Sequence, residues 1–359
     1  MTDNATLFHL LASGADDAPA ILAEGRPPLT YAGLRRLAQD TVKRLNQLGV
    51  GREDRVAIVL PNGPEMATAF VAIGCGATTA PLNPGYREEE FDFYLSDLNA
   101  RALVIERGMD SPARAVAERR GIPVVELVPD PAVAGKFTLE GEDNDRTLVP
   151  GMADAGEIGL VLHTSGTTSR PKIVPLTQTN ITTSARNIAA TLALVPEDRC
   201  LNIMPLFHIH GLIGAVLSSL SAGASVHCSP GFNALRFFAW MEAAQPTWYS
   251  AVPTMHQAIL SRAGRNKDVI DATGLRLIRS SSASLPPQVM AALEETFGCP
   301  VIESYGMTEA AHQMASNPLP PAARKPGSVG IAAGPEVGRD RGVGHYGHAG
   351  HGERGRAVP

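Results

Sequence analysis

Short runs of β-branched and aliphatic residues alternate with helical patterns along this chain. The runs lie at residues 55–60, 102–106, 123–127, 158–163, 200–204, 247–252, 275–279 and 300–304. Strands separated by helices are typical of βα units, whose strands pair in parallel. The alternation therefore predicts an α/β fold with a mostly parallel sheet. An acidic stretch rich in Gly, Asp and Asn, residues 138–157, separates two series of such units and is predicted to be a surface connection.

Capping residues mark the ends of two of the predicted helices. Thr30 is a suitable N-cap for a helix over residues 31–48, which Gly49 would end. A helix over 287–297 has two prolines before and at its start and Gly298 after its end. Residues 211–226 are uncharged but are interrupted by serines and glycines. This segment is too short for a membrane span and is predicted to be a buried helix.

The composition excludes several classes of protein. With 359 residues, of which 44% are hydrophobic and 19% charged, the chain can form a large core and is neither disordered nor a coiled coil. A net charge of −5 offers no basic surface for nucleic acid or an anionic membrane. The four cysteines are far apart and the N-terminus lacks a basic, apolar leader. We therefore expect reduced, buried thiols in a cytoplasmic protein with no integral membrane part.

Residues 163–172, HTSGTTSRPK, directly follow an apolar strand. Hydroxyls, a glycine and a lysine in this density can surround phosphate oxygens with O–H, N–H and ammonium donors. The spacing is not that of a Walker A loop. On composition alone, a solvated Ser/Thr turn is an equally good interpretation.

Three more polar segments follow predicted strands: MPLFHIHG at 204–211, RSSSASLPP at 279–287 and ESYGMTE at 303–309. The two histidines of the first segment are also compatible with core positions, and helix capping explains one serine of the second. The third combines a flat aromatic ring, a hydroxyl and a carboxylate, which suit a base, a phosphate and Mg²⁺. Open α/β sheets bind ligands at the carboxyl ends of their strands, and all four segments share that position. A nucleotide site is therefore predicted there.

At these residues the chain resembles the adenylate-forming (AMP-binding) acyl-CoA synthetase superfamily. The paired motifs HTSGTTSRPK and ESYGMTEA carry the resemblance, which runs from about residue 6 to residue 337. Within the superfamily the chain is most similar to oxalate–CoA ligases, through LHTSGTTSRPK with Ser169, PLFHIHGL, TWYSAVPT, RSSSASLPP and MTEAAHQMASNPLP. The resemblance implies the N-terminal domain of these enzymes, residues 1–337, with two doubly wound subdomains at about 1–150 and 158–330.

The resemblance also implies an ATP-dependent, AMP-forming acid–CoA ligase, with ATP, Mg²⁺ and CoA, that first makes an acyl-adenylate and then a thioester. Lys172, Thr308 and Glu309 would be catalytic, with Thr308 at the α-phosphate and Glu309 on Mg²⁺. The nucleotide would be held by Thr164, Ser165, Gly166, Thr167, Thr168, Lys172, Ser282, Ala283, Ser284, Glu303, Ser304, Tyr305, Gly306, Met307 and Thr308, with Tyr305 stacked on adenine.

The implied acid pocket consists of His208, Ser282 and His312. A small dianion such as oxalate needs polar donors of this kind, because an apolar tunnel would leave its second carboxylate buried and unpaired. The chain departs from the family pattern at Ile173, where the family usually has glycine. A β-branched residue is unfavourable there if the position requires a positive φ, and ATP affinity would then suffer.

The second departure is the tail. Residues 338–359 are rich in Gly, Arg and His, and no segment resembles the later family motifs. We expect that the β-barrel subdomain and the mobile C-terminal domain are largely missing, that both steps of the ligase reaction are impaired as a result, and that the tail is disordered or read out of frame. A natural tail with metal-binding histidines at 345, 348 and 351 is the alternative. A non-catalytic nucleotide-binding remnant, or an adenylating enzyme for a fatty or other acid, also stays open, as does the oligomeric state.

Overall fold

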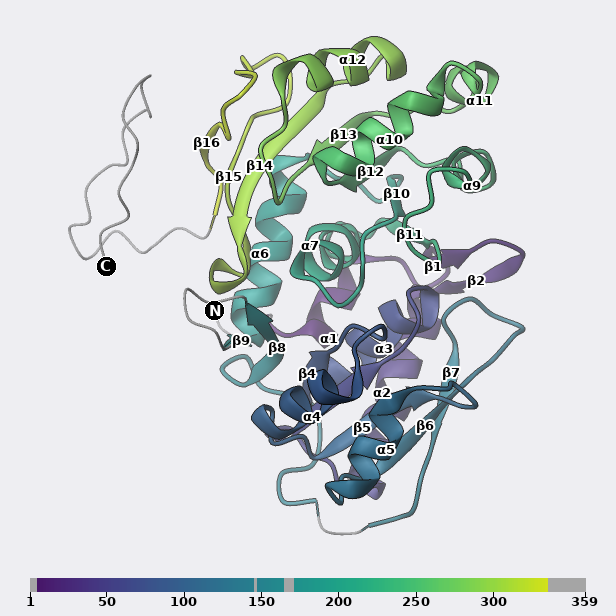
Figure 1. The fold of residues 1–359 in the computed structure, drawn as a ribbon, viewed down its shortest axis with the longest axis vertical. Coiled ribbons are helices and arrows are strands. Elements are labelled where there is room, and N and C mark those ends of the chain that lie inside the picture. Colours follow the sequence, from purple (N-terminus) through teal and green to yellow (C-terminus); the bar gives the residue numbers. More distant parts are fainter. Residues whose placement is uncertain (1–4, 145–146, 165–170, 335–359) are drawn as a thin grey trace, which may run out of the picture.

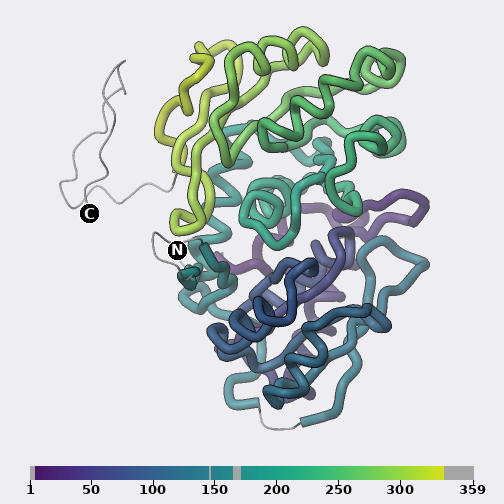
Figure 2. Tube along the Cα trace, in the orientation of Figure 1, coloured from purple at the N-terminus to yellow at the C-terminus, as the bar shows by residue number. Residues whose placement is uncertain are grey.

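Two mostly parallel β-sheets, one above the other in Figure 1, organise the chain. A computed structural model describes residues 5–144, 147–164 and 171–334, whose course Figure 2 traces. The prediction of an α/β fold is confirmed, and each of the eight predicted strands is present with its ends shifted by three residues at most.

The lower sheet in Figure 1 has seven strands. From one edge to the other they are β7 (Phe137–Glu140), β6 (Val124–Pro129), β5 (Ala102–Glu106), β3 (Arg55–Val59), β4 (Thr78–Pro81), β8 (Ile158–Thr164) and β9 (Lys172–Thr177). The five inner strands are parallel, and β7 and β9 close the edges in antiparallel pairs. Parallel pairing requires the crossover helices that the alternation predicted.

The upper sheet has nine strands. Their order is β16 (Ile331–Ala332), β15 (His312–Ser316), β14 (Val301–Met307), β13 (Leu277–Ser280), β12 (Trp248–Ala251), β10 (Arg199–Asn202), β11 (Ser225–Cys228), β1 (Pro19–Ala23) and β2 (Arg26–Thr30). The N-terminal hairpin thus joins the later sheet, since Ile21 of β1 pairs with Val226 of β11. Neither β1 nor β2, which pair with each other in an antiparallel hairpin, was predicted.

The helical segments are α1 (Leu7–Leu10), η1 (Leu11–Ser13), α2 (Tyr31–Gln47), α3 (Pro64–Gly74), α4 (Glu88–Asp97), α5 (Pro112–Arg119), α6 (Gln178–Thr191), α7 (Ile209–Gly211), η2 (Leu212–Leu217), α8 (Ser218–Ser221), α9 (Phe237–Ala244), α10 (Pro253–Ala263), α11 (Lys267–Ala272), α12 (Pro287–Phe297) and η3 (Thr308–Ala310). The Thr30 hydroxyl accepts the Gly33 N–H at 3.1 Å, and Gly298 ends α12 with φ +64°, so the predicted caps are confirmed. In the described chain no helix is long and apolar enough to cross a bilayer.

Two predicted boundaries are wrong. Residues 137–140 form strand β7, so the connection predicted over 138–157 begins with a strand. Their alternating burial, with Phe137 and Leu139 inside, favours an edge strand against β6. The helix predicted over 211–226 ends at Ser221, because Gly223 turns the backbone at φ +73° and the chain then enters β11.

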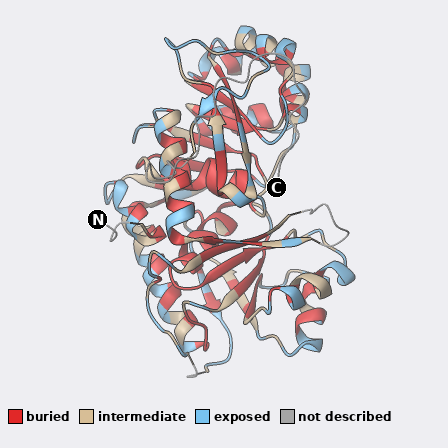
Figure 3. Ribbon diagram, turned by 90° about the vertical axis from the view of Figure 1, so that its left-hand side faces the viewer, coloured by how far each residue is buried: buried red, intermediate tan, exposed pale blue. Residues whose placement is uncertain are grey.

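One continuous apolar core joins the two sheets. It includes Phe70 of α3, Leu160 of β8, Leu212 of η2 and Val226 of β11, all of them fully buried. Figure 3 shows this buried interior running from one sheet into the other. All four cysteines are buried free thiols, as predicted. The shared core holds the strand ends of both sheets in a constant relation, which a site built from both sheets requires.

Candidate active site

Three of the four polar segments lie at the carboxyl ends of strands in the nine-stranded sheet. Strands β10, β12, β13 and β14 are parallel neighbours, so their carboxyl ends point the same way. The fourth segment follows β8 in the other sheet. Helix α6 packs against β8, β9 and β15 and brings this segment to the same place. There the Thr164 hydroxyl at the end of β8 donates to Oε1 of Glu309 in η3 at 3.3 Å.

The described part of the predicted phosphate segment consists of its two ends. Thr164 and Lys172 face each other across the antiparallel β8–β9 pair, and the Lys172 side chain is exposed. The predicted phosphate ligands Ser165, Gly166, Thr167 and Thr168 lie outside the described residues. An exposed ammonium opposite a threonine hydroxyl is compatible with phosphate binding, and the roles of these residues stay predictions.

The base of this segment is anchored to the lower sheet. His163 Nε2 contacts Asp97 Oδ2 at 3.0 Å, and its ring packs edge-on against Tyr94. Burial lowers the pKa of His163 and outweighs Asp97, which acts in the opposite direction. Ile173 pairs with His163 in regular β9 backbone and is not among the residues with a positive φ. The conformational objection to isoleucine at this position therefore does not apply.

The end of β14 and the η3 turn that follows it present their side chains to the open edge. Tyr305 is 49% exposed, Met307 and Glu309 are also exposed, and Thr308 is half-buried. Gly306 allows β14 to pass close to β15, because a Cβ there would lie 1.7 Å from the carbonyl oxygen of His312. The exposed Tyr305 ring is available for stacking on a base, as predicted from the motif.

Glu303 supports the serine-rich turn that follows β13. Its carboxylate is buried, and Oε1 accepts the Leu285 N–H at 2.9 Å. Burial raises the pKa of Glu303, while the Leu285 N–H acts against this shift. Ser282, Ala283 and Ser284 are exposed on the supported turn, and Ser304 is buried beneath it. A direct contact of Glu303 with a base stays a prediction.

Two of the three predicted acid-pocket residues are linked through a third histidine. His210 lies between them: its Nδ1 is 3.0 Å from the Ser282 hydroxyl, and its ring centroid is 5.1 Å from that of His312. His208 is exposed and its ring packs against Phe207. Burial, followed by the charges of His312 and Arg279, holds the pKa of His210 well below its usual value.

The sequence prediction did not include His210, Ser250 and Arg279 in the pocket. His210 Nε2 is 2.6 Å from the Ser250 hydroxyl, and the Arg279 guanidinium contacts His312 Nε2 at 3.3 Å. The sequence marks both histidines of the first polar segment as candidates, and a core position is the alternative interpretation for each. The available signal for Arg279 was a charged residue near the end of an otherwise apolar strand.

Strained backbone is concentrated around this pocket. Ser282, Ala311 and His312 have φ values of +73°, +52° and +100°. Residues with side chains rarely adopt such values, at a cost of about 1–3 kcal/mol each, and they cluster at functional sites. The Ser184 hydroxyl of α6 donates to the Ala311 carbonyl at 2.5 Å and helps to hold this conformation.

The residues near η3 suit a magnesium ion bound together with a nucleotide. Glu309 supplies one carboxylate, Thr164 a hydroxyl, and a cavity of 450 Å³ lies beside Glu309 between β9 and α6. No three His, Cys, Asp or Glu side chains converge within the described ranges, so the donors for an all-protein cage are lacking there. Mg²⁺ is usually bound by one or two carboxylates plus substrate phosphates, which this arrangement fits.

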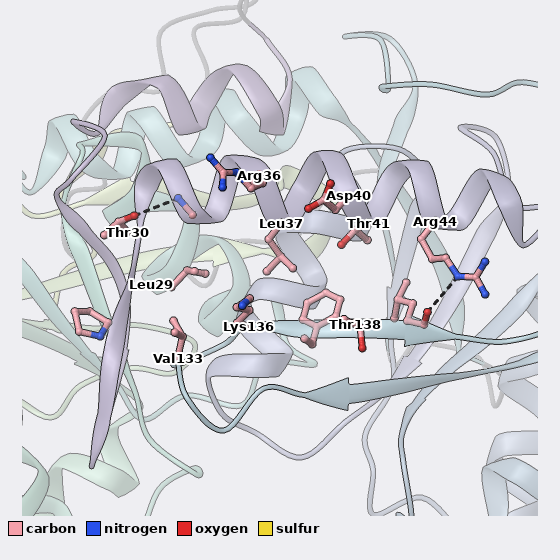
Figure 4. A pocket seen from close by; sticks show the side chains of 14 residues that line it. Leu29, Thr30, Arg36, Leu37, Asp40, Thr41, Arg44, Val133, Lys136 and Thr138 are labelled. Atoms are coloured by element: carbon pink, nitrogen blue, oxygen red, sulfur yellow. Dashed lines mark hydrogen bonds between the residues drawn. The ribbon is translucent and has the colours of Figure 1, made fainter.

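A cavity of 760 Å³ lies elsewhere, between α2 and the hairpin segment that ends in β7 (Figure 4). Leu29, Leu37, Val133, Phe137 and Leu139 form its apolar wall. None of the predicted site residues contributes to it, and Arg44 at one end donates to the Leu139 carbonyl. This cavity is therefore separate from the polar strand ends.

Comparison with known proteins identifies the class. The model of the family "AMP-binding enzyme" matches residues 9–337, and the chain belongs to this family. It is 44% identical over 348 residues to a probable CoA ligase, CCL9, of Humulus lupulus, covering 94% of this chain and 66% of that protein. It is 42% identical over 348 residues to the oxalate–CoA ligase of Arabidopsis thaliana, covering 93% and 67%.

The fold has a counterpart among solved structures. ATP-bound MatB from Rhodopseudomonas palustris superimposes with a TM-score of 0.78 at 27% identity, over 92% of this chain and 65% of that one. The chain thus spans about two thirds of the length of the relatives it matches. The resemblance to adenylate-forming acyl-CoA synthetases and the expected N-terminal domain fold are confirmed.

Proposed function

We propose that this chain binds ATP and a small dicarboxylic acid of the oxalate type, and forms the acyl-adenylate of an AMP-forming acid–CoA ligase. The observation that carries the proposal is the buried, positively charged cluster of Arg279, His210 and His312 behind the exposed Ser282. An aliphatic substrate would leave the charge of Arg279 without a counter-charge, which is costly for a buried group. Similarity to a relative named oxalate–CoA ligase supports the same class of acid.

In this proposal the AMP-binding unit comprises residues 1–337, with subdomains at about 1–150 and 158–330. Tyr305 stacks on adenine, with the turn of Ser282 to Ser284 at its edge. Lys172, Thr164 and the loop from Ser165 to Thr168 hold the β- and γ-phosphates, and Thr308 contacts the α-phosphate. The half-buried Thr164 and the exposed Lys172, which pair across β8 and β9, support the assignment.

The chemistry needs positioning and charge neutralisation more than covalent catalysis. A carboxylate oxygen of the acid attacks the α-phosphorus, and the bond to pyrophosphate breaks. The CoA thiol then attacks the acyl carbon, forming the thioester and releasing AMP with the proton of the thiol. AMP is a good leaving group, whereas the oxygen of a free carboxylate is a very poor one. Mg²⁺ held by Glu309 would neutralise phosphate charge when bound.

Isotope exchange between pyrophosphate and ATP tests the first half-reaction directly. Oxalate, malonate and a long-chain fatty acid are compared on the full chain, followed by mass-spectrometric detection of the CoA thioesters. We expect exchange that depends on oxalate, with malonate weaker and the fatty acid inactive. Exchange with the fatty acid alone would refute the proposed substrate class.

ATP binding without exchange for any acid would instead support a nucleotide-binding protein without ligase activity. Calorimetric titration with ATP in the same buffer separates this outcome from a chain that does not fold. Exchange without a thioester would confine the proposal to the adenylation step.

A further inference from the structure

Arg279 is a fully buried cation without a carboxylate partner in the described chain. It lies at the third position of β13, and its side chain is completely shielded from solvent. Its N–H groups reach three neutral acceptors: the Ser250 hydroxyl at 3.4 Å, His312 Nε2 at 3.3 Å and Gln313 Oε1 at 3.3 Å. Its Nε has no partner among the described residues.

Two other partly shielded arginines have carboxylate partners. Arg276, three residues earlier, holds the buried Asp198, and Arg114 holds Glu126. A buried charge without a counter-charge is strongly unfavourable, so it persists where a function needs it. Burial lowers the pKa of Arg279 to about 10, which leaves the guanidinium charged at neutral pH.

The guanidinium determines which nitrogen of His312 carries the proton. A guanidinium only donates hydrogen bonds, so the Nε2 of His312 has to accept. Burial and, secondarily, the charge of Arg279 hold the pKa of His312 well below its usual value, and the ring is neutral. Its one proton is therefore on Nδ1, for which the described residues supply no partner.

A second chain of hydrogen bonds also begins at Arg279. Ser250 accepts from Arg279 at 3.4 Å, and its own proton can point to His210 Nε2 at 2.6 Å. His210 then carries its proton on Nδ1 and donates it to the Ser282 hydroxyl at 3.0 Å. Ser282 is exposed, and its remaining proton is free to point outwards. Both chains thus end in a donor at the predicted acid pocket.

We propose that Arg279 is the positioning residue that makes this pocket selective for a dianionic acid. Through His312 and through Ser250 and His210 it aligns two donors, the His312 Nδ1–H and the Ser282 O–H, toward one carboxylate of the ligand. Its unpaired charge stabilises the second negative charge that distinguishes a dicarboxylate from a monocarboxylate. The inference rests on the proposed function and adds the source of its selectivity.

Gly214 of η2 leaves room for this arrangement. A Cβ at this position would lie 2.7 Å from His312 Nε2 and 3.2 Å from the nearest guanidinium nitrogen of Arg279. Contact between cation and imidazole therefore depends on the absence of a side chain there. Gly214→Ala offers a way to disturb the contact while the charge stays in place.

The test measures affinity for oxalate and for acetate by calorimetry, on the full chain saturated with a non-hydrolysable ATP analogue. We expect Arg279→Gln to weaken oxalate binding about 10- to 100-fold, the value of one charge-assisted interaction, while acetate and the ATP analogue change less than about threefold. Arg279→Lys restores part of the preference for oxalate because it restores the charge.

Arg199→Gln is the matched control. Arg199 lies in the same sheet, at the start of β10, and donates to the Ala244 carbonyl at the opposite end from the pocket. We expect its oxalate affinity to equal that of the wild type. Equal losses of oxalate, acetate and nucleotide affinity in Arg279→Gln, or no loss for oxalate, would overturn the inference.

Two further measurements keep the inference testable if Arg279→Gln does not fold. Gly214→Ala and Ser250→Ala each interrupt one of the hydrogen-bond chains, and both should weaken oxalate more than acetate; unchanged selectivity in both contradicts the proposal. In the wild type, ¹⁵N NMR should place the His312 proton on Nδ1, and an Nε2–H tautomer would contradict it. Wild-type protein that binds nucleotide but neither oxalate nor malonate would refute the proposed function itself.

Discussion

The ion pair between Arg276 and Asp198 ties together the starts of three strands that carry the candidate site. Asp198 precedes β10 and is 2% exposed, and Arg276 precedes β13. The guanidinium donates to both carboxylate oxygens, at 3.1 and 2.7 Å. The same carboxylate accepts the Thr247 hydroxyl, next to β12, at 2.6 Å and the Val195 N–H at 2.9 Å.

Replacing Arg276 by methionine removes the cation and leaves Asp198 buried with two neutral donors. Breaking a buried pair in this way costs about 3–5 kcal/mol. About a third of the Arg276 side chain is exposed, which lets water screen part of the remaining charge, so we expect a loss of about 3 kcal/mol. Arg120→Met is the matched control, because it removes an exposed bidentate partner of Asp92 and should leave stability unchanged.

Urea unfolding, followed by circular dichroism at pH 7 and at lower pH, measures the loss. Burial acts to raise the pKa of Asp198, but hydrogen bonds from Arg276, Thr247 and Val195 together outweigh it and lower the pKa. The pair therefore stabilises the fold above the unfolded-state pKa of about 3.9, and this contribution is lost as the pH falls through the folded-state pKa. The difference in the free energy of unfolding between Arg276→Met and the wild type should therefore shrink as the pH is lowered. A loss below about 1 kcal/mol at pH 7, or an equal loss in the control, would refute the reasoning.

Three further predictions concern the site. His312→Ala should lower oxalate affinity about 10- to 100-fold, because it removes a hydrogen-bond donor that contacts Arg279, and it should lower ATP affinity less than about threefold. Equal losses of both affinities in calorimetry would contradict the assignment of His312 to the acid pocket. Tyr305→Ala should weaken ATP binding about tenfold, because base stacking is lost, whereas Tyr305→Phe should keep it; equal affinities in all three proteins would exclude stacking. Burial raises the pKa of Glu303, so the folded state holds this proton more tightly and loses stability as the pH rises through that pKa. In urea unfolding, the free energy of unfolding of Glu303→Gln should therefore rise relative to the wild type as the pH increases above the unfolded-state pKa of about 4.3, and a difference independent of pH would contradict this.

The strands and helix ends that were predicted share a local cause. Thr30 caps its helix through an N–H three residues away, and Gly298 ends one by its own backbone conformation. Sequence patterns within ten residues were therefore enough to predict these helix ends. Strands β1 and β2 form a local hairpin that was not predicted, and the place of this hairpin in the sheet depends on β11, which lies some two hundred residues later in the chain.

In the candidate site, too, local sequence patterns predicted one part and only the fold determined the other. The polar segments were found because they follow parallel strands, and the strand order alone places such ends together. Which side chains meet at the pocket was not accessible to that reasoning. His210 joins Ser282 to Ser250 only because β10, β12 and β13 are neighbours in this sheet and the backbone of Ser282 adopts a positive φ.

The sequence by itself determined the α/β class, the family and the strand ends at which a nucleotide would bind, because hydrophobic periodicity and short motifs are local properties. Only the tertiary structure decided that Arg279 has neutral partners alone among the described residues, and that His312, His210 and Ser250 gather beside it. The physical reason is that burial and the absence of a counter-charge depend on every element packed around a residue. A charged residue in an apolar strand is visible in the sequence; what surrounds it is not.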